Sequence, residues 1–267
     1  MLTKDCFVFP EFKVINNKEN VCDNVQSLFT TRNGGVSNGC FTSNNLGLHV
    51  NDDEKSVLKN RKRIIQFINN NFLQNQNDNS ITISWMNQVH SDKVKVVKNT
   101  ADALVVDEVD AQVTREKNIA LAVMTADCLP VLLRSIDGDV VAAVHCGWKG
   151  LASNVLENTI LAMNCERNKI MAWLGPCIGK ECFEVGQEVK QIFEKKDLAL
   201  GQFFKQKDDV HYLGDLKGIA KYILNQLNVS NVSVNEECTY SNVDKYYSYR
   251  KEKITGRMAG VIWIQKK

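Results

Sequence analysis

Two histidines and one cysteine stand in this chain where they could bind a metal ion. His90 ends the segment Trp85-Met86-Asn87-Gln88-Val89-His90, Cys128 follows one strongly apolar run, and His145 ends another. The separations, 90 to 128 and 128 to 145, are too wide for a zinc-finger pair, so only the fold can bring these side chains together. Two imidazoles and one thiolate are the donor set of a catalytic zinc site that keeps its fourth coordination position open.

The same residues allow two other interpretations. Cys128 as a thiolate nucleophile, with His145 as its base, would make a cysteine hydrolase or amidase. Alternatively, a histidine after an apolar strand and a cysteine beside it are ordinary core residues. Spacing does not separate these three hypotheses.

The elements around these residues predict how they meet. Residues 119–124 form a continuous apolar run, typical of a strand buried on both faces. Residues 130–136 and 139–145 are apolar runs around Asp137-Gly138, a strong hairpin signal. Cys128 and His145 are therefore expected at the open end of one hairpin, where their side chains can meet.

The rest of the chain mixes helices and strands. Helices are predicted after Asp52-Asp53, over residues 151–163 and over 216–227, with a loop over 69–80. In the first helix the apolar face is predicted to hold Val57, Leu58, Ile64, Ile65, Ile68 and Phe72. Further strands are predicted over 170–174, 229–234 and 259–264. Because βαβ alternation is lacking, we expect an α+β fold of layered mixed β-sheets flanked by helices, with residues 1–267 forming one domain.

Composition narrows the function classes. The chain has 267 residues with a formal net charge of +2, so no strong field draws it to nucleic acid or to an anionic membrane. No apolar run approaches the ~18 residues of a membrane span. The nine cysteines lack the dense, even spacing of a disulfide framework, which favours reduced thiols and a cytoplasmic location. A small-molecule ligand fits best, and the sequence does not fix an oligomeric state.

Several motifs together resemble one known family nearly from end to end. The chain resembles the bacterial purine nucleoside phosphorylase family, also described as multicopper polyphenol oxidases or laccase-domain proteins. The matching segments include Asn45-Leu46-Gly47-Leu48-His49-Val50, Asn87-Gln88-Val89-His90, Val109-Asp110-Ala111, Thr125-Ala126-Asp127-Cys128-Leu129-Pro130, Val144-His145-Cys146-Gly147-Trp148-Lys149-Gly150, Tyr247-Ser248-Tyr249-Arg250 and Thr255-Gly256-Arg257. Two departures are Cys146, where the family commonly has Ala, and Lys149, where Arg is common.

The resemblance implies a function and a cofactor. It implies that His90, Cys128 and His145 bind zinc, and that the substrates are purine nucleosides and phosphate. It implies phosphorolysis of adenosine, inosine and methylthioadenosine to free base and a ribose 1-phosphate, with an adenosine deaminase side activity. Copper is the second metal that the family's descriptions suggest, but four histidines cannot furnish the sites of a true laccase. Another line of naming ties the family to editing of peptidoglycan precursors.

Phosphorolysis needs groups that hold phosphate, and guanidinium forks suit this task best. Matching segments supply five candidates for binding substrate or phosphate: Arg32, Ser37, Asn45, Arg61 and Arg250. Asp127 and Glu184 are candidates for moving protons in deamination, and Asp127 is equally plausible as a structural carboxylate. Trp148 is expected either to stack on a purine or to lie in the core. Gly34, Gly35 and Gly147 are expected in turns with positive φ.

Overall fold

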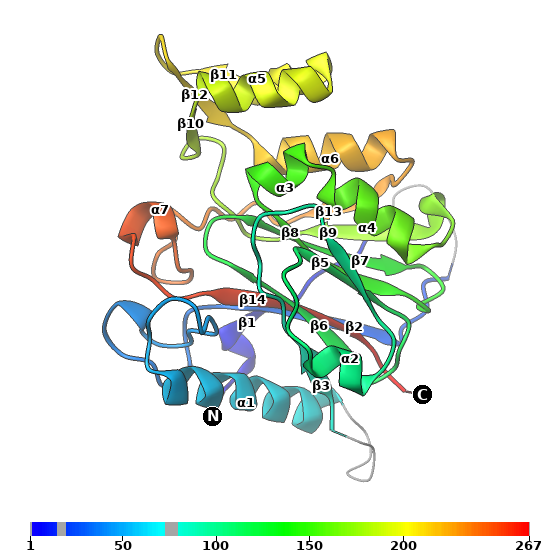
Figure 1. Cartoon of the computed structure of the whole chain (residues 1–267). Coiled ribbons are helices and arrows are strands. Elements are labelled where there is room, and N and C mark those ends of the chain that lie inside the picture. The colour runs from blue at the N-terminus through cyan, green and yellow to red at the C-terminus, as the bar shows by residue number, and fades with distance from the viewer. Residues whose placement is uncertain (1, 15–19, 73–79, 267) are drawn as a thin grey trace.

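Two large mixed β-sheets stack face to face in the computed structural model, which describes residues 2–14, 20–72 and 80–266 (Figure 1). The five-stranded sheet has the order β1 (Phe7–Val8), β2 (Val25–Thr30), β14 (Met258–Ile264), β6 (Ile119–Thr125) and β3 (Thr82–Ser84). The six-stranded sheet has the order β13 (Asn231–Val234), β9 (Ile170–Leu174), β7 (Leu129–Ser135), β8 (Val141–Cys146), β5 (Ala111–Thr114) and β4 (Val94–Val97). The expected fold of layered mixed sheets in a single domain is confirmed.

Apolar side chains fill the space between the two sheets and cover their outer faces. Phe29, Leu132 and Trp173 belong to the cluster between the sheets. Helix α1 (Glu54–Phe72) covers the outer face of the five-stranded sheet, and α3 (Trp148–Ala152), α4 (Val155–Met163) and α6 (Leu216–Gln226) cover the other outer face (Figure 1). The order of layers is therefore helix, sheet, sheet, helices.

A smaller unit lies beyond the helices on the six-stranded side. It contains a three-stranded antiparallel sheet of order β10 (Glu184–Gly186), β12 (His211–Gly214) and β11 (Phe204–Gln206), with helix α5 (Gln187–Lys196) (Figure 1). Two short helices complete the fold: α2 (Thr100–Leu104) and α7 (Tyr249–Glu252). Among the described residues, no helix combines the length and the apolar composition needed to cross a membrane.

The predicted hairpin is confirmed, and it positions the chemistry. Strands β7 and β8 pair antiparallel, with Pro130 opposite His145, and Gly138 in the connecting turn has a φ of +69°. Strand β6 is buried at every residue, as its apolar run predicts. Asp53 caps α1 by accepting a hydrogen bond from the Ser56 N–H at 2.9 Å.

Four predicted details were wrong. The helix over residues 151–163 is two helices, because Asn154 adopts left-handed backbone angles (φ +74°) and interrupts it. Leu58 is 48% exposed, because it lies off the buried face of α1, and Phe67 is buried on that face instead. The strand over 229–234 begins at Asn231. The loop over 69–80 begins too early, because α1 continues to Phe72, and residues 73–79 lie outside the described residues.

Candidate metal centre

The hairpin and one loop bring His90, Cys128 and His145 together. Cys128 directly precedes β7, and His145 lies on β8 opposite Pro130, so the two side chains meet at one end of the hairpin. His90 reaches the same point from the loop between β3 and β4. One ligand atom from each residue lies within 4.8 Å of the other two.

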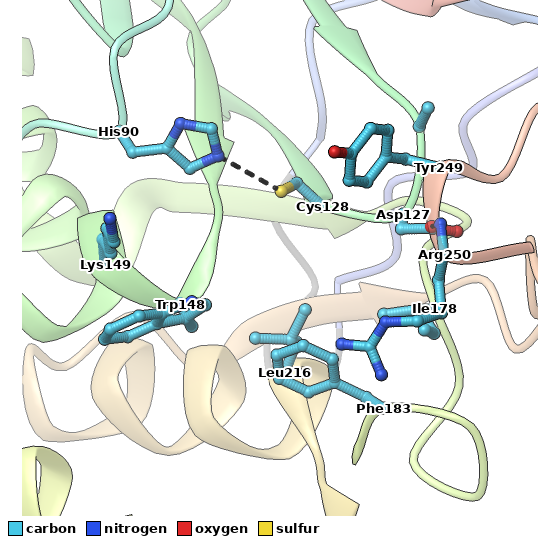
Figure 2. A pocket seen from close by; sticks show the side chains of 11 residues that line it. His90, Asp127, Cys128, Trp148, Lys149, Ile178, Phe183, Leu216, Tyr249 and Arg250 are labelled. Carbon is cyan, nitrogen blue, oxygen red and sulfur yellow. Dashed lines mark hydrogen bonds between the residues drawn. The ribbon is translucent and has the colours of Figure 1, made fainter. Parts of the chain in front are cut away.

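These donors fit a tetrahedral metal ion. The Cys128 Sγ and His90 Nε2 atoms are 3.7 Å apart (Figure 2). Zinc bonds of ~2.3 Å to sulfur and ~2.0 Å to nitrogen at the tetrahedral angle predict a separation of about 3.5 Å. His145 uses its Nδ1 atom to contact Asp110 at 2.8 Å, which leaves Nε2 as the ligand atom. The residues present are therefore arranged as a site for one metal ion.

Asp110 holds two of the three ligands in place. Its carboxylate is fully buried and accepts hydrogen bonds from the backbone N–H groups of Val89, His90 and Ser91. The same carboxylate contacts the ring of His145. The backbone of His90 has a φ of +61°, an unusual angle that these hydrogen bonds stabilise. A carboxylate that orients a ligand histidine is a common partner of metal sites.

Charges in the group favour a thiolate. Burial raises the pKa of the Cys128 thiol, but the charge of His145 and hydrogen bonds from His145 and His90 outweigh burial and bring the pKa to about 6. Burial lowers the pKa of His145, but the Cys128 thiolate and Asp110 raise it to about 9. Burial likewise raises the pKa of Asp110, and hydrogen bonds from His145 and Ser91 lower it to about 2. The thiolate is the form of cysteine that binds metal or acts as a nucleophile.

Gly147 leaves the space in which the ligands meet. A Cβ atom on this glycine would lie 2.8 Å from His90 Cδ2 and 3.2 Å from Cys128 Sγ. Its φ of −67° is ordinary, so the predicted positive φ at Gly147 was wrong, and close approach is the reason for glycine. Gly34 does have a positive φ of +88°.

A pocket of about 300 Å³ opens beside the metal ligands (Figure 2). Its walls come from the loop between β6 and β7, the segment between β9 and β10, and helices α3, α6 and α7. The lining residues are Ala126, Asp127, Trp148, Lys149, Ile178, Phe183, Leu216, Tyr249 and Arg250, together with His90 and Cys128. Trp148 lines this pocket and also packs against the core, so both interpretations of it apply. A concave site with aromatic walls and a few polar groups is typical of small-molecule binding.

Of the five predicted substrate residues, Arg250 lines this pocket and Arg61 does not. Arg250 lines the pocket, with its guanidinium 5.7 Å from the centre of the Phe183 ring. Arg61 is half-buried, and burial lowers its pKa to about 10. Arg61 stacks on Trp85 at 3.9 Å and is near His49, whose pKa is lowered first by burial and then by Arg257, Arg61 and His145.

The other three predicted residues belong to hydrogen-bond networks outside the pocket lining. Arg32 donates to the carbonyls of Thr42 and Val243 and pairs with Glu252 at 3.0 Å. Ser37 and Asn45 are buried and accept hydrogen bonds from the Asn60 amide, through the Ser37 hydroxyl and the Asn45 carbonyl. Their contacts hold loops together, and their predicted role in binding substrate stays a prediction.

The two candidates for moving protons differ in position. Asp127 lines the pocket, but its carboxylate accepts hydrogen bonds from the Thr239 hydroxyl and the Arg250 N–H, each at 2.6 Å. This is the structural arrangement that the sequence also allowed. Glu184 lies on β10, where it pairs with Lys207.

Sequence reasoning gave no role to Asp110, Phe183 or Tyr249. Asp110 carried at most a weak signal: it directly precedes β5, which is buried throughout although half of its residues are polar, and a buried carboxylate needs donors. Phe183 and Tyr249 gave none, since an aromatic residue in a loop or at a short helix is more often part of the core.

The chain belongs to a family with a metal-related description. Residues 26–265 match the family model of the multi-copper polyphenol oxidoreductase laccases, and the chain is a member of that family. Its relatives carry a second name. A Haemophilus influenzae protein named purine nucleoside phosphorylase is 38% identical over 260 residues, which cover 95% of this chain and 100% of the relative. The Escherichia coli protein named purine nucleoside phosphorylase YfiH is 38% identical over 240 residues, or 90% of this chain and 94% of the relative.

Solved structures agree on the fold. The Neisseria meningitidis protein NMB0706 superposes with a TM-score of 0.87 at 38% identity, over 98% of this chain and 100% of the other. YlmD from Geobacillus stearothermophilus has a TM-score of 0.82 at 24% identity, over 96% of this chain and 100% of the other. The similarity to YlmD supports the fold alone.

Proposed function

We propose that this protein is a zinc-containing purine nucleoside phosphorylase. It cleaves adenosine, inosine and methylthioadenosine with phosphate to free base and a ribose 1-phosphate, with adenosine deaminase as a side activity. The observation that carries the proposal is the convergence of His90, Cys128 and His145 beside a pocket that Arg250 lines. The names of relatives at 38% identity support the same reaction.

The pocket offers the groups that phosphorolysis needs. The rings of Phe183, Tyr249 and Trp148 present apolar faces on which a purine can stack. Arg250 supplies a guanidinium for a phosphate, and its backbone is held by Asp127. Arg61 is the second candidate for phosphate.

The metal ligands have a distinct task. His90, Cys128 and His145 would hold zinc, which when bound supplies a Lewis acid beside the substrate. Asp110 fixes the ring of His145, and Gly147 keeps the space between ligands clear. The protein thus provides a rigid donor set at one end of a pocket of about 300 Å³.

The proposal is tested by following inosine cleavage with and without phosphate. Phosphorolysis gives hypoxanthine and ribose 1-phosphate only when phosphate is present. Free ribose released at the same rate in phosphate-free buffer would reject it. Release of ammonia from adenosine tests the deaminase activity, and elemental analysis of the purified protein distinguishes zinc from copper.

One observation favours a second candidate, a cysteine hydrolase. Cys128, His145 and Asp110 also form a nucleophile, base and orienting carboxylate, and the lowered pKa of Cys128 suits a nucleophile. Peptidoglycan precursors are then the substrate class that the family's other naming suggests. Removal of metal with a chelator separates the candidates, because a thiol hydrolase keeps its activity and the phosphorylase loses it. The hydrolase hypothesis leaves His90 without a role, whereas the metal hypothesis uses all three donors.

A further inference from the structure

A second pocket, of about 490 Å³, holds two thiols outside the metal centre. Cys182 lies in the turn between β9 and β10, and Cys238 follows β13. Both side chains are half-buried and line this pocket, so they are open to small solutes. Gly179 lies between the two residues, since its N–H donates to Cys238 Sγ and its carbonyl accepts from the Cys182 N–H at 2.9 Å. A hydrogen bond with Cys238 is also among the causes that act on the pKa of Cys182.

Hydrogen-bond donors surround the sulfur of Cys238. The Gly179 N–H donates to Cys238 Sγ at 3.1 Å. Burial raises the pKa of Cys238, but hydrogen bonds from Ser241, Gly179 and Tyr240 outweigh burial and lower it. Lys180, Lys217 and Lys221 line the pocket in equal number with the carboxylates Glu181, Asp215 and Glu236, so the hydrogen bonds to the sulfur, and no net charge of the lining, favour the anionic form. Such surroundings stabilise a thiolate.

Cys182 has the opposite character. Its sulfur lies 3.8 Å from the Ser241 hydroxyl, and burial together with the neighbouring Cys238 raises its pKa. The pKa of Cys238 is therefore lowered and that of Cys182 is raised, and both thiols line the same pocket. By contrast, Cys177 is fully buried, and burial raises its pKa to about 12, which makes it an inert thiol.

We propose that Cys238 and Cys182 form a peroxide-reactive dithiol that closes to a disulfide. The Cys238 thiolate attacks one oxygen of a hydroperoxide, the O–O bond breaks, and Cys238 becomes a sulfenic acid while the leaving oxygen departs as hydroxide or alkoxide. Cys182, on losing its proton, then attacks the Cys238 sulfur and expels hydroxide. The S–S bond forms, the two thiols are oxidised, and the peroxide is reduced to water or an alcohol.

Hydrogen bonds between neighbouring residues connect this dithiol to the metal centre. Thr239, next to Cys238, donates its hydroxyl to Asp127 at 2.6 Å, and Asp127 directly precedes the ligand Cys128. The Ile178 N–H donates to the Asp127 carbonyl at 2.9 Å, and Ile178 and Phe183 line the metal pocket on either side of the turn that carries Cys182. Closing the disulfide draws this turn toward Cys238, so it deforms a wall of the metal pocket. This last consequence rests on the proposed function, whereas the disulfide itself does not.

The test treats the zinc-loaded protein with hydrogen peroxide and digests it without reduction. We expect a linked peptide pair containing Cys182 and Cys238, lighter than the two thiol peptides by the mass of two hydrogens. In Cys182→Ser, dimedone should label Cys238 as a sulfenic acid. In Cys238→Ser, Cys182 should stay unlabelled. Cys40→Ser, which removes an exposed cysteine elsewhere, is the matched control and should behave as wild type.

Three results would overturn the proposal. One is a zinc-loaded protein that consumes peroxide without forming the linked peptide, and another is dimedone labelling of Cys182 in Cys238→Ser. The third is Cys40 reacting as fast as Cys238 in the wild type. Zinc content measured before and after treatment shows whether Cys128 was oxidised instead. The connection to the pocket is supported if peroxide lowers inosine cleavage, if reductant restores the cleavage, and if Cys182→Ser makes the cleavage insensitive to peroxide. A disulfide that forms with unchanged cleavage contradicts only that connection.

Discussion

Replacing Asp110 with asparagine should weaken the metal centre without touching a ligand. One carboxylate oxygen accepts from the His90 N–H and contacts His145 Nδ1, and the other accepts from Val89 and Ser91. An amide has only one oxygen, so its amino group must face one of these two sets of donors. If the amino group faces the N–H groups of Val89 and Ser91, both of these donors lose their acceptor. Facing His145, it favours the tautomer with the proton on Nε2, the atom that must bind metal.

The expected magnitudes follow from these contacts. Each buried donor that loses its acceptor costs about 1–3 kcal/mol, so with two such donors the metal-free variant should be less stable by about 2–6 kcal/mol. Loss of a partner that orients a ligand typically lowers metal affinity ten- to a hundredfold, or about 1.4–2.7 kcal/mol.

Two measurements check this prediction. Competition with a chromophoric chelator gives the zinc affinity, and denaturant unfolding of the metal-free protein gives the stability without the contribution of bound metal. Asp137→Asn makes the same chemical change at a side chain that is 60% exposed, and it should shift stability by less than ~0.5 kcal/mol. A zinc affinity of Asp110→Asn within twofold of wild type would contradict this role for Asp110.

Other substitutions test the remaining parts of the site. Cys128→Ala should lose most of the zinc measured by elemental analysis, and full occupancy would reject the donor set. Gly147→Ala should lower zinc content, because its Cβ would lie 2.8 Å from His90 Cδ2, whereas Gly260→Ala, whose Cβ would meet only the side chains of Val123, Leu132 and Phe29 at 3.3 Å or more, should keep it; equal zinc in both variants would contradict the role given to Gly147. Arg250→Ala should raise the phosphate KM by roughly one to two decades and leave zinc unchanged, since a charge-assisted hydrogen bond contributes ~1.5–3 kcal/mol; an unchanged phosphate KM would point to Arg61. Arg32→Ala should lower the melting temperature with little effect on the phosphate KM, because Arg32 joins loops through Thr42, Val243 and Glu252, and a phosphate-specific defect in a stable variant would contradict this.

The fold was predictable where burial imposes a simple pattern. Strand β6 and the hairpin of β7 and β8 are buried throughout, so continuous apolar runs with a turn signal located them. The break at Asn154 was not predictable, because the apolar spacing continues across it and only the left-handed backbone angle interrupts the helix. Strand order could not be read from the sequence, since β14, near the C-terminus, pairs with β2, near the N-terminus, and with β6, in the middle of the chain.

The site was predictable to a different extent for each residue. The hairpin register placed Cys128 beside His145, whereas the position of His90 depended on the resemblance, because nothing local ties its loop to the hairpin. Arg32 and Arg250 stand in similar matching segments, yet one joins loops and the other lines the pocket. Long-range contacts decide between such roles, and spacing carries no information about them.

The geometry of the metal centre rests on two different kinds of constraint. Cys128 and His145 are fixed by β-sheet register: a slip of one residue would turn His145 to the opposite face, and the buried strands around it make that slip expensive. His90 has no such support, because it lies in a loop and adopts a positive φ. Asp110 joins the loop to the strand, since its buried carboxylate accepts a hydrogen bond from the backbone N–H of His90 and orients the ring of His145. Gln88 anchors the same loop to the backbone of Met124 on β6, but Asp110 is the side chain that contacts both the backbone of His90 and the ring of His145. A change at Asp110 should therefore affect metal binding more than its distance from the metal would suggest.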